Sequence, residues 1–558
     1  MSALALCPSA AAQEYTEAEL IEIPDLTFEG EIMVTGSLIP RADLTSLSPV
    51  TVMEVPQELT YSGTVRIEDL VKTMPQIFVD QNSTIANEAS GTATIELRDL
   101  GPERTLVLIN GRRLTPGNPA GYVGGDLNVV PAPLVKRVDV LTGGASTVYG
   151  SDAVGGVVNF ILDTDFTGVR GGLQYSFYNH DNNNSLAQEI NRAAGYDPPT
   201  GITNDGDAWN ANVALGGKFA DGRGHASVYI DYRKIEELRR GDRDYSHCPE
   251  WFDSEGLICD GSVANERGVF EAYNSDGTPN PNGYLTLDWH EDGGDGHSFR
   301  PWDGDRYNFE PSNHIQRPDE KWNAGAFANY EINRHFDVYL EVMYMNNSTD
   351  AQIAPSGNFG STSTINCDNP MLSEQQWETI CGPATGYLWG NVRPRPPARY
   401  AEVSIYRRNV EGEPRSNQIG HNDIRMIAGL RGDIDANWRY DFYWLRAENH
   451  YQESFLNDID VERMTHALDV IEDPETGEWV CRNPDARAEG CVPWNIFQQG
   501  AVTQEALDYI SAVGVMYGTV STEVFNFTAT SDWKSYGVAI PSAREGVQAA
   551  SGVEYRNE

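Results

Sequence analysis

Apolar and polar residues alternate strictly in several segments after residue 165. In residues 225–233, for example, every second position from Ala226 to Tyr232 is apolar, and Ser227 and Asp231 lie between them. The same alternation occupies residues 212–219, 336–345, 424–434 and 547–556. A period of two predicts β-strands. Because one face repeatedly carries charge, we expect that face to contact water.

The connections between these strands alternate between short and very long. Tight links occupy residues 220–224, 332–335 and 435–437. Long polar stretches lie at about residues 180–208, 236–320, 348–421 and 450–522. Soluble sandwiches rarely show this regularity, whereas outer-membrane barrels have short periplasmic turns and long external loops. The pattern therefore predicts antiparallel strands of a transmembrane β-barrel. Aromatic residues beside the short turns fit either an interfacial girdle or ordinary sheet packing: Phe219, Tyr330, Phe336, Trp438 and Tyr440.

Residues 48–165 have a mixed pattern instead. Apolar residues at helical spacing predict a helix between Thr64 as N-cap and Pro75 as stop. Apolar runs around it predict strands, one of them closed by a turn at Asn110-Gly111. These strands are expected in residues 48–53, 92–100, 105–114, 134–144 and 156–162. The pattern predicts an α+β domain ahead of the barrel strands.

Small residues are concentrated in VYGSDAVGG at 148–156, directly before an apolar strand. The glycine spacing approaches that of a phosphate-binding loop, but Gly156 and Val157 stand where such a loop needs Lys and Ser or Thr. GASTV at 144–148 lacks the last glycine of a nucleophile elbow. We therefore predict that the glycines serve turns and close backbone packing. They are Gly143, Gly144, Gly150, Gly155 and Gly156.

The chain is strongly acidic, with 82 Asp and Glu against 40 Lys and Arg. This balance argues against a nucleic-acid partner, because phosphate binding needs a basic face. No apolar run of about 18 residues occurs, so the sequence predicts no transmembrane helix. Acidic residues of the long loops fit either a Ca²⁺ or cationic-ligand site or a solvated surface: Asp292, Asp295, Asp303 and Asp305. We favour the surface and predict no metal site and no cofactor.

Six of the seven cysteines form three close pairs in turn-rich polar stretches. The pairs are Cys248 with Cys259, Cys367 with Cys381, and Cys481 with Cys491. Short-range pairs are typical of loop disulfides in an oxidising compartment. Metal binding is the alternative, but no histidine stands at ligand spacing. We predict three disulfides, with the pairing assigned from proximity.

The N-terminal residues also favour export. Residues 1–12 resemble the end of a secretion signal, with Ala10-Ala11-Ala12 before Gln13 as a cleavage site, and we expect the signal to start upstream. A frayed cytosolic N-terminus is the alternative. Residues 13–47 are expected to be flexible, because 14–30 are acidic and contain no basic residue. EIMVTGS at 31–37 is a short β-prone island within them.

Several of these stretches together resemble the plug of a TonB-dependent outer-membrane receptor. They are EIMVTGS, LRDLGPERTLVLINGRRL at 97–114, and LVKRVDVLTGGASTVYGSDAVGGVVNFIL at 134–162. In this family a globular plug lies inside a barrel of about 22 strands. The resemblance therefore implies a plug domain over residues 48–165 and barrel strands with long external loops over 166–558.

The resemblance also implies roles for two sets of residues. A TonB box would pair by strand addition with TonB, the energy-coupling protein anchored in the inner membrane. It consists of Glu31, Ile32, Met33, Val34, Thr35 and Gly36, with methionine at a position where valine is commoner. Plug arginines would meet carboxylates of the barrel wall, or else belong to a solvated hairpin: Arg98, Arg104, Arg112 and Arg113.

The implied function is that of a receptor and transporter in the bacterial outer membrane, not of an enzyme. An extracellular siderophore–iron complex, cobalamin or an oligosaccharide would bind loops and plug, and TonB would supply energy. A passive porin or adhesin barrel and a secreted β-rich hydrolase are the alternatives. About nine or ten candidate strands follow residue 165, fewer than the family's roughly 22. We therefore expect an incomplete product with the remaining wall missing or encoded separately, or, as the alternative, a smaller barrel.

Overall fold

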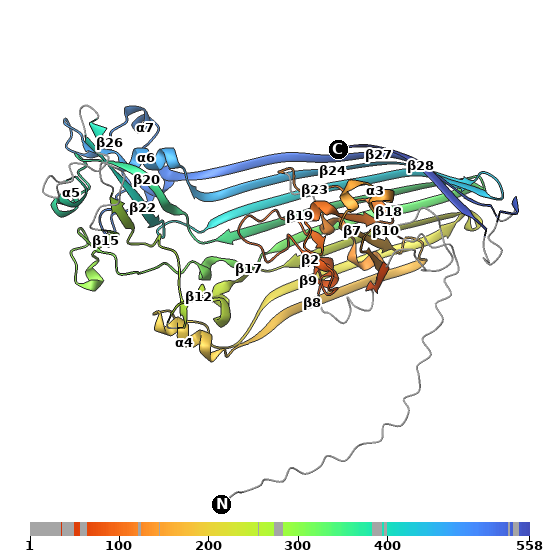
Figure 1. Cartoon of the computed structure of the whole chain (residues 1–558), viewed down its shortest axis with the longest axis horizontal. Helices are drawn as coiled ribbons and strands as arrows, with labels where there is room; N and C mark the ends of the chain where they lie inside the picture. Colours follow the sequence, from red (N-terminus) through yellow and green to blue (C-terminus); the bar gives the residue numbers. More distant parts are fainter. Residues whose placement is uncertain are drawn as a thin grey trace, which may run out of the picture.

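The computed structural model describes most of the chain (Figure 1). The described residues are 35, 50–55, 64–120, 124–143, 145–254, 256–272, 283–381, 393–394, 399–533, 536–538 and 546–558. The predicted signal remnant, residues 31–34 and 36 of the predicted TonB box, and Gly144 lie outside them.

The region after residue 50 folds around a small mixed sheet with strand order β1-β6-β7-β4-β5. Its strands are β1 (Val50–Glu54), β4 (Thr105–Ile109), β5 (Arg112–Arg113), β6 (Val135–Leu141) and β7 (Gly156–Leu162). Strands β4 and β7 are parallel, and the other neighbours are antiparallel. Short elements surround the sheet: β2 (Ile77–Val79), β3 (Ile95–Leu97), α2 (Ile67–Val71), α3 (Ser146–Tyr149), η1 (Pro102–Arg104), η2 (Leu127–Val129), η3 (Ala132–Leu134) and η4 (Ser151–Ala153). We call residues 50–162 the plug.

Two predicted elements of the plug are shorter than expected. The helix begins at Ile67 with Arg66 as N-cap, because the Thr64 hydroxyl accepts a hydrogen bond from Arg66 N (3.1 Å) ahead of the helix. Strand β3 ends at Leu97, since Arg98 and Asp99 have φ values of 59° and 58°, a turn conformation that interrupts an extended strand. In both cases a local hydrogen bond or turn makes the element shorter than its apolar pattern predicts.

Long strands form a second, larger sheet, which we call the wall. Among the described residues it has nine strands in the order β28-β27-β24-β23-β19-β18-β10-β9-β8. They are β8 (Gly168–Asn182), β9 (Gly201–Phe219), β10 (Gly224–Ile235), β18 (Asp319–Asn333), β19 (Phe336–Ile353), β23 (Arg415–Asp433), β24 (Trp438–Ile459), β27 (Ser511–Asp532) and β28 (Gln548–Asn557). All neighbours are antiparallel and follow the chain order. The expected mainly-β fold, with a plug followed by long antiparallel strands, is confirmed.

The wall is an open sheet. Strands β8 and β28 are its two edges, and the described residues contain no ladder that joins them. Strand β24 has 22 residues, more than the roughly 9–11 that a strand needs to cross a bilayer, so the wall extends well beyond one membrane thickness. The plug lies against one face of this curved sheet (Figure 1).

The two faces of the wall differ in chemistry. On β10, Val228 and Ile230 are 47 % and 44 % exposed, whereas Asp231 and Arg233 are 3 % and 2 % exposed. The polar side chains therefore point toward the plug and the apolar ones point away from it. This is the reverse of a soluble protein, and it is the arrangement of a sheet with lipid on its outer face.

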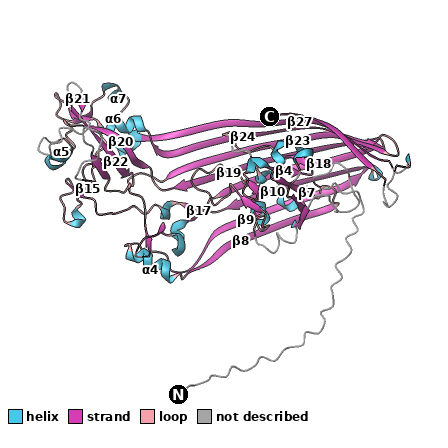
Figure 2. Cartoon of the chain, in the orientation of Figure 1, coloured by secondary structure: helices cyan, strands magenta, loops and turns pink. Residues whose placement is uncertain are grey.

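The long connections fold into a third layer at the end of the wall opposite the short turns (Figures 1 and 2). A six-stranded sheet and several helices enclose a core that includes Trp494, Phe497 and Phe270. We call this the outer layer. Sequence analysis described these stretches only as polar loops and missed their core. The signal was the apolar run CVPWNIF at 491–497.

The elements of the connections are mostly short. The strands are β11 (Leu238–Arg239), β12 (Glu250–Phe252), β13 (Leu257–Cys259), β14 (Val269–Ala272), β15 (Leu285–Leu287), β16 (Phe299–Pro301), β17 (His314–Gln316), β20 (Gly357–Asn366), β21 (Arg393–Pro394), β22 (Arg399–Arg408), β25 (Val470–Glu472) and β26 (Trp479–Cys481). The helices are α4 (Ser185–Ala193), α5 (Glu374–Ile380), α6 (Val461–Leu468), α7 (Pro484–Ala488), α8 (Gln504–Ile510), η5 (Ala220–Gly222), η6 (Arg240–Asp242), η7 (Asp244–Ser246), η8 (His290–Asp292) and η9 (Glu310–Ser312). In the part of the chain that the structure describes, every helix is too short or too polar to span a membrane.

Candidate functional site: the plug–wall interface

Arg112 joins the plug to the wall. It follows the tight turn at Asn110-Gly111, where both residues have positive φ, so the hairpin β4–β5 projects its side chain from the plug. One guanidinium nitrogen lies 2.9 Å from Glu341 Oε1, and another donates to the Tyr339 hydroxyl at 2.7 Å. The contact spans more than two hundred residues of sequence.

Two aromatic rings complete the surroundings of Arg112. Its guanidinium carbon lies 4.9 Å from the ring centres of both Tyr339 on β19 and Tyr443 on β24. Burial acts to lower the pKa of Arg112, but Glu341 and the neighbouring tyrosines and Asp441 outweigh burial and raise that pKa. The side chain therefore remains a cation although it is almost fully enclosed.

Arg113 reaches the other edge of the wall. Its guanidinium lies 2.5 Å from Asp152 in η4 and 4.0 Å from Glu554 on β28. Asp152 also pairs with Arg556 of β28 at 3.1 Å. Partial burial opposes ionisation of Asp152, but Arg113 together with a bond from Ser151 and the charge of Arg556 lowers the pKa of that carboxyl.

Arg98 and Arg104 contact the plug itself. Arg98 donates to the carbonyl of Gly155 at 3.3 Å, and Arg104 donates to the carbonyl of Leu100 at 2.7 Å and pairs with Glu103. Neither has a wall partner among the contacts of the described residues. A role for these two arginines in holding the plug to the wall stays a prediction.

The predicted packing glycines occupy two kinds of position. At Gly156, the first residue of β7, φ is +140° and an added Cβ would lie 2.2 Å from the carbonyl oxygen of Leu141 on β6. At Gly155 the same atom would lie 2.9 Å from the carbonyl oxygen of Arg104. Gly143 and Gly150 have more space, but their φ values are +121° and +93°. Backbone approach therefore requires glycine at the start of β7, and turn geometry favours it at the other two positions.

Thr35 is the described residue of the predicted TonB box, and it is buried in the plug. It is 1 % exposed. Its hydroxyl donates to Asp139 of β6 at 3.1 Å and accepts from the Asn159 amide of β7 at 3.0 Å. Arg137 holds the other oxygen of Asp139 at 2.9 Å. The plug thus binds this threonine through a closed polar network.

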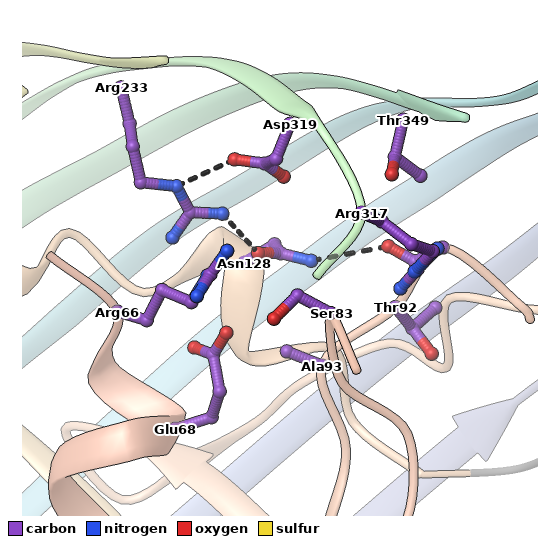
Figure 3. A pocket seen from close by; sticks show the side chains of 11 residues that line it. Arg66, Glu68, Ser83, Thr92, Ala93, Asn128, Arg233, Arg317, Asp319 and Thr349 are labelled. Carbon is purple, nitrogen blue, oxygen red and sulfur yellow. Dashed lines mark hydrogen bonds and ion pairs between the residues drawn. The ribbon is translucent and has the colours of Figure 1, made fainter. Parts of the chain in front are cut away.

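Sequence analysis missed a second polar cluster between plug and wall (Figure 3). Asn128 of η2 accepts a hydrogen bond from Arg233 at 3.1 Å through its side chain. Its carbonyl accepts from Lys321 at 3.3 Å and from Asn323 at 3.0 Å. Arg233 also pairs with Asp319 at 2.7 Å. The charged residues on the polar face of the alternating strands could have indicated this cluster. They showed that the face is polar, but not that the plug contacts it.

The three predicted cysteine pairs all form disulfides in the connections outside the wall: Cys248–Cys259, Cys367–Cys381 and Cys481–Cys491. Three of the four acidic loop residues pair with arginines, whereas Asp295 accepts hydrogen bonds from the His297 backbone N–H and the Ser298 hydroxyl. Asp303 lies 3.0 Å from Arg300, and Asp305 lies 3.4 Å from Arg267. A hydrogen bond from Arg267 lowers the pKa of Asp292. Across the described residues, no group of His, Cys, Asp or Glu side chains has the arrangement of a metal site.

Comparison with known proteins identifies a family for the plug. A family model described as TonB-dependent Receptor Plug Domain matches residues 44–157. The ferric enterobactin receptor PirA of Pseudomonas aeruginosa is 34 % identical over 114 residues, which cover 19 % of this chain and 15 % of that receptor.

Solved structures of similar proteins include two siderophore receptors. A mutant of the ferric enterobactin receptor PfeA of Pseudomonas aeruginosa, in complex with enterobactin, is 14 % identical, with a TM-score of 0.38, and the match covers 90 % of this chain and 54 % of that one. The siderophore receptor PiuA of Acinetobacter baumannii is 11 % identical, with a TM-score of 0.38, 95 % of this chain and 64 % of that one covered. This chain thus spans between 54 % and 64 % of the length of these two solved chains.

Proposed function

We propose that this chain, a TonB-dependent receptor by its plug domain, takes part in the uptake of an iron–siderophore complex across the outer membrane. Receptors of this family are transporters and not enzymes. The observation that carries the proposal is that the matched plug lies on the polar face of a wall of long strands and is bound there through Arg112 and Glu341. A passive pore has no use for a domain that occupies its interior.

The siderophore class is supported by a relative. The protein that is 34 % identical over 114 residues is a ferric enterobactin receptor. The outer layer lies at the end of the wall where the long connections gather, so it supplies the surface that an external ligand meets first (Figure 1). Cobalamin and oligosaccharides remain the alternative cargoes, and the same uptake assay distinguishes them.

Energy coupling requires that the TonB box, residues 31–36, becomes available to TonB by strand addition. Thr35 is bonded to Asp139 and Asn159 inside the plug. We infer that ligand binding loosens this network, so that the segment leaves the plug and pairs with TonB. The backbone then supplies most of the contact, which tolerates methionine at position 33.

The open edges of the wall support a further part of the proposal. Exposed apolar side chains cover both edge strands, with Leu173 on β8 76 % exposed and Val553 on β28 70 % exposed. In lipid, each unpaired backbone group at such an edge costs several kcal/mol. We therefore propose that further strands pair with β8 and β28 and complete the barrel, in agreement with an outer-membrane location.

The test is uptake of radiolabelled iron in a strain that lacks its own siderophore receptors. The protein, together with any strands encoded beside it, is expressed with and without TonB. We expect accumulation of a ferric siderophore only when TonB is present, and no accumulation of labelled cobalamin or maltooligosaccharide. Equal uptake with and without TonB would support the passive porin. Transport of another cargo would reject only the siderophore class.

A further inference from the structure

A small cavity lies between the plug and the outer half of the wall (Figure 3). Its volume is about 10 Å³, which is room for about one water molecule. Plug residues Arg66 and Glu68 line it on one side, and Arg317 and Asp319, at the start of β18, line it on the other. The cavity therefore lies at the contact between the plug and the wall.

Arginines outnumber carboxylates in the lining of this cavity, with three against two. Arg233 is already matched, because it pairs with Asp319 at 2.7 Å. Arg66 lies 3.7 Å from Asp69, which is outside the lining. Among the described residues, Arg317 has no carboxylate within ion-pair distance, and Arg66, Arg317 and Glu68 are each at least nine-tenths buried.

The unmatched groups are also short of hydrogen-bond acceptors. Arg66 Nη2 and both Nε and Nη1 of Arg317 are buried and have no partner among the described residues. Glu68 Oε2 is the one carboxylate oxygen of the lining that shares this condition. Three nitrogen donors thus face one available acceptor. A water molecule accepts about two hydrogen bonds and must also donate, so it fits this ratio poorly.

The electrostatics agree with a missing acceptor. Burial lowers the pKa of Arg317 to about 10; the charge of Arg66 acts in the same direction, and Asp319 and Glu68 oppose it. Burial also raises the pKa of Glu68, so this carboxyl is disposed to take up a proton. A negative charge in the cavity would reduce the repulsion between the two arginines and satisfy their donors.

We propose that the cavity binds one small inorganic anion of the halide class, with chloride as the physiological ion, between Arg66 of the plug and Arg317 of the wall. A cavity of about 10 Å³ suits a single small ion better than sulfate or phosphate. The anion crosslinks the plug to the wall near the outer layer, whereas Arg112 and Glu341 connect them elsewhere on the interface. Its loss loosens that end of the plug.

The test uses the full chain purified in detergent, with gluconate replacing chloride at constant ionic strength. We expect the midpoint of thermal unfolding to rise saturably as chloride or bromide is added. Arg317→Met should weaken the apparent halide affinity at least tenfold. Arg104→Met, at an exposed plug arginine, is the matched control and should leave that affinity unchanged.

Crystals grown in bromide provide a second measurement that needs no variant. An anomalous peak between Arg66 and Arg317 is expected. No saturable halide effect, or the same effect in Arg317→Met as in Arg104→Met, would mean a general salt effect and overturn the proposal. A wild-type crystal with water at the cavity and no anomalous peak would overturn it even if the variant failed to fold. Transport is not measured, so these outcomes are independent of the siderophore proposal.

Discussion

The substitution Arg112→Met tests how strongly the plug is held against the wall. Methionine keeps much of the side-chain volume but removes the charge that faces Glu341 at 2.9 Å. Both side chains are 11 % exposed, so the change leaves a carboxylate buried without its main partner. Breaking a buried ion pair costs about 3–5 kcal/mol. Arg425 lies 3.7 Å from Glu341 and retains part of the attraction, so we expect a loss of roughly 2–4 kcal/mol.

Hydrogen exchange of the β4–β5 hairpin, residues 105–113, measures this loss directly. The expected free energy corresponds to opening that is roughly 30- to 1,000-fold more frequent. Arg104→Met is the control, because Arg104 contacts only plug atoms among its recorded partners, and it should change protection by less than about 0.5 kcal/mol.

A double substitution separates the ion pair from simple packing. Because Glu341 also faces Arg425 at 3.7 Å, Glu341→Gln is measured alone as well, and the loss of stability in Arg112→Met with Glu341→Gln should be smaller than the sum of the two single losses. Equal protection in Arg112→Met and Arg104→Met would refute the claim that this pair holds the plug. Single losses that simply add in the double variant would refute the electrostatic explanation.

Three further outcomes are expected. Thr35→Val removes the bond to Asp139 and should increase crosslinking of the N-terminal segment to a TonB fragment, with unchanged crosslinking as the contrary result. Replacing Cys481 and Cys491 by serine should destabilise the outer layer by about 2–5 kcal/mol, seen as faster proteolysis of residues 461–510 while the wall stays intact. Folding lowers the pKa of Asp152 from 3.8, so its stabilising ion pairs are present above that pH and are lost as the pH falls through the lower folded value. Acidification below about pH 4 should therefore reduce hydrogen-exchange protection of the plug, and the reduction should be smaller in Asp152→Asn.

The polar contacts between plug and wall have a physical consequence for the proposed transport. An apolar interface between plug and wall would be difficult to separate, because buried apolar area contributes about 25 cal/mol per Å². Ion pairs and hydrogen bonds of the kind formed by Arg112 and Asn128 hold a fixed geometry, yet water can replace them one at a time. The interface therefore positions the plug but still allows it to move relative to the wall.

The sequence by itself determined the wall strands, their short turns and the disulfides. The reason is locality: the alternation around Val228 and Asp231 records an apolar outer face and a polar inner face, residue by residue. Cys481 and Cys491 are close in the chain, so their pairing could also be predicted from the sequence. The plug was recognised from stretches such as 134–162 because each carries its own pattern.

Only the tertiary structure decided which polar groups meet. Nothing near Arg112 in the chain identifies Glu341, and nothing near Thr35 identifies Asp139, because these partners are 229 and 104 residues apart. The alternating pattern of a strand says that a side chain faces inward, but the docking of the plug selects what it faces. The core of the outer layer was missed for the same reason: Phe270, Ile405 and Trp494 come from three separate connections, and even the apolar run at 491–497 does not identify the residues it packs against.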